Sequence, residues 1–362
     1  MRPRAIAQTH KRVDDVRGDV QNLEAQLQRM AAELKALSDR SASMSVQQQE
    51  VLSSIEHVAR TVDRLESTVG GLELRESQLR AVARRDIELE HEVKSLASVM
   101  CDVDVDAHIT RQIKSVALSH SPFPHVVVDD LLPAALYQAL IRGLPPVELF
   151  NDRPPNERQL AVPLKIAPVY ARCVWTYMAR TVVEQMLTPA LLHLFKPVLN
   201  AWLAHNFPAL GDDPVDRVPM HASDGRILLR TRGYVIPPHR DPKWGFVTCL
   251  LYLARPGDSE SWGTQLYAVD GDEEARGTTP NWIDPNRCRY VSDVAFVPNR
   301  ALVFLNSVGA HGARIADDAV EGLERYAYQF RIGPHSKTAI DRLLEDLPAD
   351  RRSFWQGRRS DY

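Results

Sequence analysis

Two side chains of metal-binding types, His239 and Asp241, lie two residues apart in the segment Pro238-His239-Arg240-Asp241. In an extended strand, residues i and i+2 point to the same face. An imidazole and a carboxylate on one face supply two of the three ligands of the 2-His-1-carboxylate site of non-haem Fe(II) oxygenases. With 12 histidines in 362 residues, such a triplet also arises by chance, so the interpretation requires a third ligand and a fitting context.

His311, in the segment Ala310-His311-Gly312, is the candidate for the third ligand. It follows an apolar run in which Phe304 is expected to point inward. The stretch between His239 and His311 is long enough for about four strands. Because strands of a closed antiparallel sandwich return to the same end, the two histidines can become neighbours in space.

A strand with alternating side chains is predicted from Arg325, fourteen residues after His311. On one face it would carry Tyr326, Tyr328 and Phe330, and on the other Arg325, Ala327, Gln329 and Arg331. An arginine inside a small barrel is costly unless it is paired, and the carboxylate of a ligand would pair with it through two hydrogen bonds. We therefore predict that this face binds an anionic ligand.

Short apolar runs separated by turn residues fill the chain from residue 226 onward. Segments such as Pro256-Gly257-Asp258 and Pro298-Asn299-Arg300 contain the residue types that favour turns. Several short strands at this spacing are typical of a barrel or a jelly roll. The runs predicted as strands are Arg226–Arg230, Phe246–Leu253, Thr264–Ala268, Val294–Val297, Arg300–Leu305 and Tyr326–Ile332.

Helices and a further strand are expected ahead of these runs. Val126–Val128 predicts a strand, and Pro133 favours the start of a helix because proline suits the first helical turn. Residues 175–205 carry apolar side chains at helical spacing. We therefore predict that residues 123–335 form an α+β domain with a double-stranded β-helix (jelly-roll) core, followed by a charged tail at 336–362 that contains one possible helix, Ala339–Leu347.

Residues 11–100 have the pattern of a coiled coil. From Val13 to Leu72 the apolar residues recur in steps of three and four, which keeps a 3.5-residue repeat over about eight heptads. The mixture of Val, Leu and Ile at position a, with Leu, Met and Val at position d, favours a parallel dimer and leaves a trimer open. Gln48 at position a either fixes the register or is a tolerated flaw. Gly70-Gly71 predicts a break in the helix, since each glycine costs about 1 kcal/mol relative to alanine.

Composition restricts the remaining possibilities. A net charge of −3 and a pI near 6.5 give no reason to expect nucleic acid as a partner. The sequence contains no run of 18 apolar residues, so no membrane-spanning helix is expected. The N-terminus lacks the apolar stretch of a secretory signal. Four widely spaced cysteines are typical of reduced thiols, so we expect a cytoplasmic protein. The acidic segment 101–122 is expected to be a linker.

Taken together, the motifs resemble those of the 2-oxoglutarate- and Fe(II)-dependent dioxygenase family, in its prolyl-4-hydroxylase-like branch. The resemblance covers residues from about 123 to 333, a little over half of the chain. It depends on the order and spacing of several segments. These are Phe123–Asp129, Pro238–Asp241, Gly263–Leu266, Asn299–Phe304, His311-Gly312 and Arg325-Tyr326.

In that family, residues matching His239, Asp241 and His311 bind Fe(II), and a basic residue best matched by Arg325 pairs with the distal carboxylate of 2-oxoglutarate. Three protein ligands leave three positions on the ion, two for the keto acid and one for O2. The resemblance therefore implies a hydroxylase that converts 2-oxoglutarate and O2 to succinate and CO2, and it admits ascorbate as a further cofactor. A protein side chain, a glycan and a small metabolite all stay open as the substrate.

This chain departs from the family pattern at two points. Many relatives have a tyrosine nine residues before the first metal-binding histidine, where this chain has Arg230. Tyr234 and Tyr252 are the candidates to replace the contact of that tyrosine with the cosubstrate. The segment before Arg325 is also longer than expected, which keeps Arg331 as the alternative partner of 2-oxoglutarate.

Two other functions fit part of the pattern. A coiled-coil scaffold could carry a β-sandwich that binds a partner without catalysis, although the complete His-Asp-His set argues against it. A metal-binding jelly roll that does not use 2-oxoglutarate would retain its activity after loss of Arg325.

Overall fold

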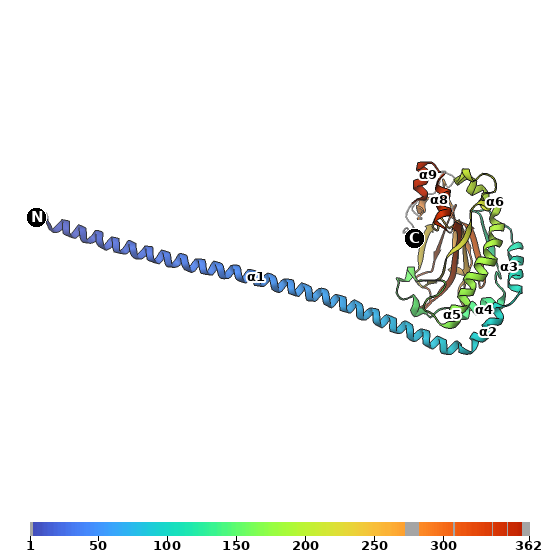
Figure 1. Cartoon of the computed structure of the whole chain (residues 1–362), viewed down its shortest axis with the longest axis horizontal. Coiled ribbons are helices and arrows are strands. Elements are labelled where there is room, and N and C mark those ends of the chain that lie inside the picture. Colours follow the sequence, from blue (N-terminus) through green and yellow to red (C-terminus); the bar gives the residue numbers. More distant parts are fainter. Residues whose placement is uncertain (1–2, 272–281, 307, 335, 346, 357–362) are drawn as a thin grey trace. The chain divides into compact units, whose positions relative to one another are not determined.

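The chain divides into two compact units, Met1–Glu73 and Leu74–Tyr362. Helix α1 begins at Pro3 and ends at Leu89, and it makes up the described part of the first unit (Figure 1). No helix in the described part of the chain is both long enough and apolar enough to cross a bilayer. The computed structural model describes residues 3–271, 282–306, 308–334, 336–345 and 347–356.

The break predicted at Gly70-Gly71 is wrong, because both glycines lie within α1. Glycine keeps its backbone N–H and C=O groups, so the hydrogen bonds of the helix continue through the pair at a cost of about 1 kcal/mol per glycine.

The second unit begins inside the range predicted as coiled coil. Leu89 of α1 and Leu96 of helix α2 (Val93–Met100) are buried in the hydrophobic core of this unit. Helix α3 (Asp104–Lys114) lies in the segment that was predicted as a linker. Its acidic residues form the outer side of an amphipathic helix, since a spacing of four residues places on the buried face Val105, Ile109 and Ile113.

Two antiparallel sheets form the centre of the second unit. The larger sheet has the order β1-β8-β5-β10-β3-β2, and the smaller has the order β4-β9-β6-β7. The strands of the larger sheet are β1 (His125–Val128), β2 (Gln159–Ala161), β3 (Met220–Arg230), β5 (Val247–Tyr252), β8 (Ala301–Leu305) and β10 (Arg325–Pro334). Those of the smaller sheet are β4 (Val235–His239), β6 (Thr264–Val269), β7 (Cys288–Val294) and β9 (Ala310–Arg314).

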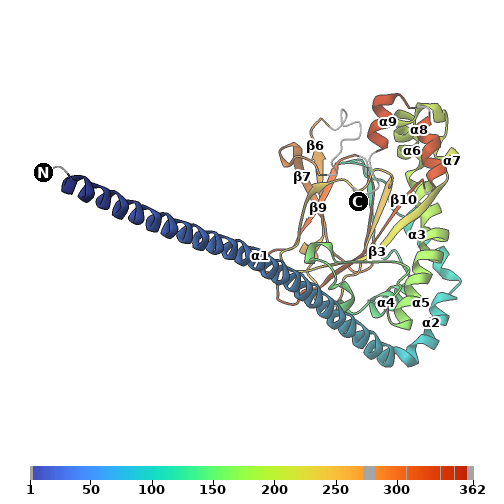
Figure 2. The ribbon, with the colours of Figure 1, turned by 60° about the vertical axis from the view of Figure 1, so that its left-hand side comes forward.

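From β3 onward the chain crosses repeatedly between the sheets, which gives the two-sheet strand order of a jelly roll. Figure 2 shows β6, β7 and β9 on one side and β3 and β10 on the other. The prediction of antiparallel β structure after residue 226 is confirmed, but Val294–Val297 is not a strand, because β7 ends at Val294. The predicted runs did not include β2, β4 or β9, and they missed β7 except for its last residue, Val294.

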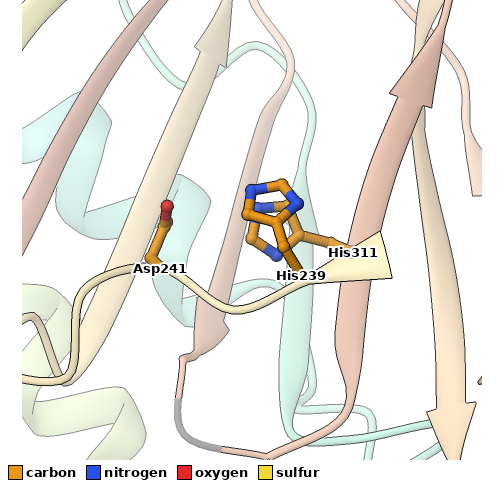
Figure 3. Close-up of side chains that lie close together, drawn as sticks. All are labelled: His239, Asp241 and His311. Carbon is orange, nitrogen blue, oxygen red and sulfur yellow. The ribbon is translucent and has the colours of Figure 1, made fainter. Parts of the chain in front are cut away.

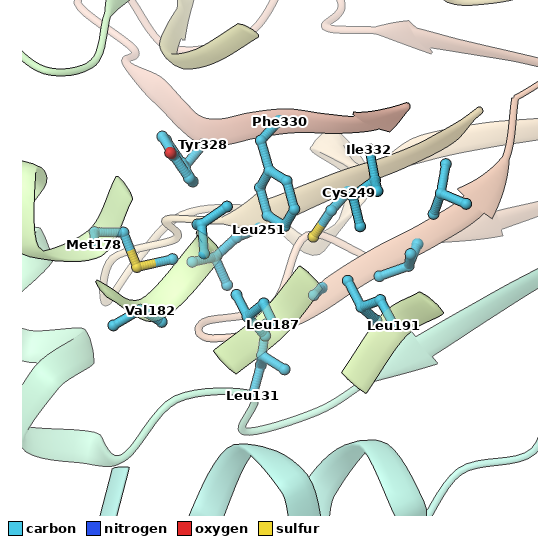
Figure 4. Close-up of a cluster of buried hydrophobic side chains, with 14 of the residues drawn as sticks. Leu131, Met178, Val182, Leu187, Leu191, Cys249, Leu251, Tyr328, Phe330 and Ile332 are labelled. Carbon is cyan, nitrogen blue, oxygen red and sulfur yellow. The ribbon is translucent and has the colours of Figure 1, made fainter. Parts of the chain in front are cut away.

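Helices cover the outer face of the larger sheet. They are α4 (Ala134–Arg142), α5 (Val169–Tyr177), a π-helix (Met178–Leu187) and α6 (Thr188–Asn206). Figure 4 shows how Val182, Leu187 and Leu191 from the helices pack toward Leu251 and Phe330 from the sheet. This apolar layer uses the outer face of β5 and β10, so the polar residues of these strands are left on the inner face.

The predicted tail contains two helices, α8 (Lys337–Glu345) and α9 (Ala349–Trp355). Trp355 is buried against Trp202 and Trp244, which ties α9 to the core. The remaining short helices are η1 (Glu90–Glu92), η2 (Val147–Phe150), η3 (Pro155–Glu157), η5 (Pro208–Leu210), α7 (Pro214–Arg217), η6 (Glu260–Trp262) and η7 (Pro285–Arg287).

Candidate metal centre

His239, Asp241 and His311 meet inside the second unit. His239 is the last residue of β4 and pairs directly with His311 of β9, and their ring centroids lie 4.2 Å apart. One potential ligand atom from each of the three residues lies within 4.8 Å of the others, and all three residues are buried. Figure 3 shows the two imidazoles side by side, with the carboxylate of Asp241 next to them. The four strands expected between the two histidines are β5 to β8.

The route by which Asp241 reaches the histidines differs from the predicted one. Asp241 lies two residues beyond the end of β4, so strand alternation does not place it. Asn306, the residue that follows β8, holds the segment instead. Its Oδ1 accepts a hydrogen bond from the backbone N–H of Asp241 at 2.6 Å, and its Nδ2 donates to the carbonyl oxygens of Asp241, Pro242 and Gly245 at 2.8 to 3.0 Å.

The carboxylate of Asp241 has three donors. Oδ1 accepts from Arg331 Nη2 at 2.9 Å, and Oδ2 accepts from Thr248 Oγ1 at 2.8 Å and Gln329 Nε2 at 3.3 Å. Burial raises the pKa of Asp241, but the opposing effect of the Arg331 charge, together with His311 and the hydrogen bond from Arg331, is larger and leaves the pKa below its usual range. Asp241 is therefore an anionic oxygen donor at neutral pH.

Both imidazoles are neutral at pH 7. Burial lowers the pKa of His239, and it lowers the pKa of His311 to about 3, assisted by the nearby His239. Nδ1 of His239 lies 2.9 Å from the carbonyl oxygen of Pro237, which can only accept, so Nδ1 carries the proton and Nε2 has the free lone pair. Two neutral imidazoles and one carboxylate match the donor set that binds Fe(II) in the 2-His-1-carboxylate sites.

A cavity of about 170 Å³ opens beside the three donors. This volume is below the range of drug-sized pockets, so the cavity suits a small molecule. Asp241 is the one acidic residue among its lining residues, whereas the basic ones are Arg226, Arg230, Arg325 and Arg331. The excess of guanidinium groups favours an anionic ligand.

Arg325 lines this cavity, and its buried charge has no acidic partner among the described residues. Arg325 is only 5% exposed to solvent. Its Nε donates a hydrogen bond to the carbonyl oxygen of Trp262. The guanidinium lies over the ring of Phe296, with its carbon 4.8 Å from the ring centre. Burial lowers the pKa of Arg325, and no carboxylate is among the groups that affect it. Arg331, by contrast, is already paired with Asp241.

The two predicted tyrosines occupy different positions. Tyr234 lines the cavity, and Arg230 lies over its ring with the guanidinium carbon 4.9 Å from the ring centre. Tyr252 lies behind the lining, where its hydroxyl donates to Thr264 Oγ1 at 2.7 Å. Sequence reasoning did not single out Thr248 or Asn306, because isolated polar residues next to apolar runs carry no motif.

Comparisons with known proteins give low similarities. No protein-family model matches the chain, and no curated protein sequence matches it. Among solved structures, a prolyl 4-hydroxylase from Phytophthora capsici is similar over 69% of this chain and 77% of that one, at 16% identity and a TM-score of 0.37. A prolyl-4-hydroxylase from Pseudomonas putida is similar over 63% of this chain and 100% of that one, at 14% identity and a TM-score of 0.35.

HygX from Streptomyces hygroscopicus, solved with nickel and 2-oxoglutarate, is similar over 58% of this chain and 82% of that one, at 20% identity and a TM-score of 0.35. TM-scores below 0.5 establish neither a family nor an activity for this chain.

We expect His239→Ala and His311→Ala to weaken binding of Mn(II) to the full-length protein by at least about 100-fold, because each removes one of three protein ligands and outer contacts alone are worth 10- to 100-fold. Titration followed by the electron paramagnetic resonance signal of free Mn(II) measures this. His205→Ala is the control, since His205 is exposed and its substitution should leave the affinity unchanged. Equal affinity in all four proteins would exclude the site.

Asn306→Ala should weaken Mn(II) binding by about 10- to 100-fold, because the segment that carries Asp241 loses its anchor. Asn299→Ala is a matched control, because Asn299 is also a buried asparagine. Its Oδ1 accepts a hydrogen bond from the backbone N–H of Leu132 and its Nδ2 donates to the carbonyl oxygen of Leu132, so it does not bond to the segment that carries Asp241. Both variants should lower the free energy of unfolding in urea, by about 1–3 kcal/mol for each buried group left unpaired. Unchanged Mn(II) affinity in Asn306→Ala would show that Asn306 has no role in positioning Asp241.

Proposed function

We propose that this chain is a 2-oxoglutarate- and Fe(II)-dependent oxygenase that hydroxylates a C–H bond of its substrate. One observation carries the proposal: a buried His-Asp-His donor set and a buried arginine without an acidic partner line the same small cavity. A metal ion alone would account for the donor set. It would not account for Arg325, whose buried charge requires an anion.

Different residues of the cavity would bind the metal ion and the two ends of a small keto dicarboxylate. His239, Asp241 and His311 would hold the ion, and a bound ferrous ion supplies the redox chemistry by which O2 is activated. Arg325 would pair with the carboxylate at the far end of 2-oxoglutarate, and a guanidinium can do so through two parallel hydrogen bonds. Thr248 and Arg331 keep the Asp241 carboxylate ionised and oriented.

The overall reaction is balanced by the two co-substrates. 2-Oxoglutarate loses its C1 carboxylate as CO2 and becomes succinate, which takes up one oxygen atom of O2. The other oxygen atom enters the C–H bond of the substrate, which becomes an alcohol. No further reductant is consumed in this reaction, so ascorbate would serve only to keep the iron ferrous.

The substrate class stays open among a protein side chain, a glycan and a small metabolite. The alternative of a non-catalytic scaffold does not explain why three buried donors and a buried cation converge, since unpaired buried charges are costly for a structural core.

Arg325→Gln should lower the affinity for 2-oxoglutarate by about 10- to 100-fold while leaving Mn(II) binding unchanged, because a hydrogen-bonded pair with a charged group is worth about 1.5–3 kcal/mol. Isothermal titration of 2-oxoglutarate into the Mn(II)-loaded protein measures the first quantity. Wild-type affinity in Arg325→Gln would contradict this role and would favour a metal site that does not use 2-oxoglutarate.

An anaerobic titration of the wild-type protein with Fe(II) and 2-oxoglutarate provides the direct test of the proposal as a whole. A weak visible charge-transfer band is expected when both are present, and it should be absent in His239→Ala. Succinate release during incubation with pools of peptides, glycans and metabolites would then identify the substrate class.

A further inference from the structure

The first unit carries a long apolar stripe on α1. Within the described side chains, the apolar residues at heptad positions a and d are 45% to 69% exposed. They are Leu23, Leu27, Met30, Leu34, Leu37, Met44, Val51, Ile55, Val58, Val62, Leu65, Val69 and Leu72. At 1.5 Å per residue the stripe is about 70 Å long. Monomeric proteins rarely expose a contiguous apolar surface of this extent to water.

A second copy of this chain fits the stripe because the stripe is complementary to itself. A 3.5-residue repeat keeps one seam facing a partner helix along its whole length, and an identical helix presents the same seam in the same phase. The first unit has no other element that could cover it among the described residues.

The polar positions of the seam decide the orientation. Ser41 and Gln48 occupy two successive a positions, whereas the d positions hold apolar residues. In a parallel, in-register pair each a residue meets its own counterpart, so the two Gln48 amides can hydrogen-bond to each other. In an antiparallel pair Gln48 would face an apolar d residue and lose its hydrogen bonds to water without replacement.

We propose that residues 23–72 form a parallel, in-register, two-stranded coiled coil with a second copy of this chain. β-Branched residues at several a positions, such as Ile55 and Val62, and leucines at several d positions favour two strands over three.

Two pairs of substitutions in the full-length protein test the interface. Leu27→Asp with Leu34→Asp places charges in the seam, and Ala25→Asp with Ala32→Asp adds the same charges on the opposite side of the helix. Light scattering after size exclusion should give the mass of two chains for the wild type and the Ala25/Ala32 protein, and of one chain for the seam protein. A wild-type mass of one chain or three chains would overturn the proposal.

Disulfide formation tests the orientation. In a Cys101→Ser background, Ile55→Cys lies in the seam and should form a covalent dimer under mild oxidation, whereas Ser53→Cys lies outside it and should not. A dimer by mass that cross-links at neither position, or equally at both, would overturn the parallel register.

A second, independent observation concerns Arg230, the residue that stands where the resembling family has a tyrosine. Arg230 of β3 lies directly opposite Arg325 of β10 in the register of the sheet, and both line the cavity. Residues opposite one another in an antiparallel pair share a face with their Cβ atoms about 5 Å apart, and like charges in this arrangement repel. The charge of Arg230 also lowers the pKa of Arg325.

Arg230 is held in place but is not neutralised. Its Nη1 donates to the carbonyl oxygens of Arg158 and Leu229 at 2.6 and 2.9 Å, while its Nε is buried without a hydrogen-bond partner. The residue is 7% exposed. Two buried guanidinium groups side by side, with neither paired to an acid among the described residues, are a binding site for an anion.

The geometry points to Arg230 as a second cationic contact of the distal carboxylate of the keto acid, an inference that rests on the proposed function. Arg230 would contact the carboxylate through a charge, where the tyrosine of the related pattern has a hydroxyl group. The face of the Tyr234 ring, over which the guanidinium lies, would support Arg230 in this position.

Two ligands distinguish this role from a general structural one. 2-Oxoglutarate has the distal carboxylate and 2-oxopentanoate lacks it, while the ends that face the metal are the same. Arg230→Gln should weaken 2-oxoglutarate binding to the Mn(II)-loaded protein by about 10- to 100-fold and leave 2-oxopentanoate binding unchanged. Arg230→Lys should recover part of the loss. Arg314→Gln removes the same charge from an exposed position of β9 and should change neither affinity.

The outcomes separate this inference from the proposed function. If the wild type binds 2-oxoglutarate and Arg325→Gln weakens it, but Arg230→Gln does not, the role of Arg230 is wrong and the oxygenase proposal stands. Equal losses for both keto acids in Arg230→Gln would also overturn it, since they would indicate a distorted metal centre. If the wild type binds neither keto acid, the proposed function itself fails.

Discussion

The buried ion pair between Arg331 and Asp241 controls the chemistry available to the cavity. Without a nearby cation, burial would favour the protonated form of Asp241, and a neutral acid is a poor metal ligand. With Arg331 at 2.9 Å, the carboxylate stays charged while burial keeps both histidines neutral. The same pairing holds Arg331 beside Asp241, whereas Arg230 and Arg325 line the same cavity without an acidic partner among the described residues.

The jelly-roll strand order explains how residues so far apart in the sequence meet. β4 and β9 are neighbours in the smaller sheet, which brings His239 beside His311, and β8 ends next to the segment after β4, where Asn306 fixes Asp241. The larger sheet contributes the donors to Asp241 from β5 and β10. Its outer face is covered by helices, so the inner face is free to carry polar residues around the cavity.

The sequence singled out His239, Asp241 and His311 because such residue types are few and their order along the chain matches a known kind of site, and the structure brings the three side chains together. It could not predict how they are held. The His-x-Asp spacing suggested strand alternation, yet the carboxylate lies beyond the strand and depends on Asn306, which has no local signature. Strand alternation placed Arg325 and Arg331 on one face. It could not show which of the two is free to pair with a ligand, because Arg331 makes a long-range pair with Asp241.

β9, with Ala, Gly and a charged end, has little strand propensity and forms because its neighbours on both sides are strands. Within the acidic segment 101–122, α3 forms over Asp104–Lys114 for a similar reason, since three of its apolar residues pack against a core.

A crystal structure of the protein loaded with Mn(II) and 2-oxoglutarate, with data collected at the manganese absorption edge, tests the central claim most directly. The anomalous signal should lie among the side chains of His239, Asp241 and His311, and the electron density of the keto acid should extend from it to the guanidinium of Arg325. An anomalous peak elsewhere in the molecule, or a keto acid that leaves Arg325 without contact, would contradict the assignment of this cavity as the active site.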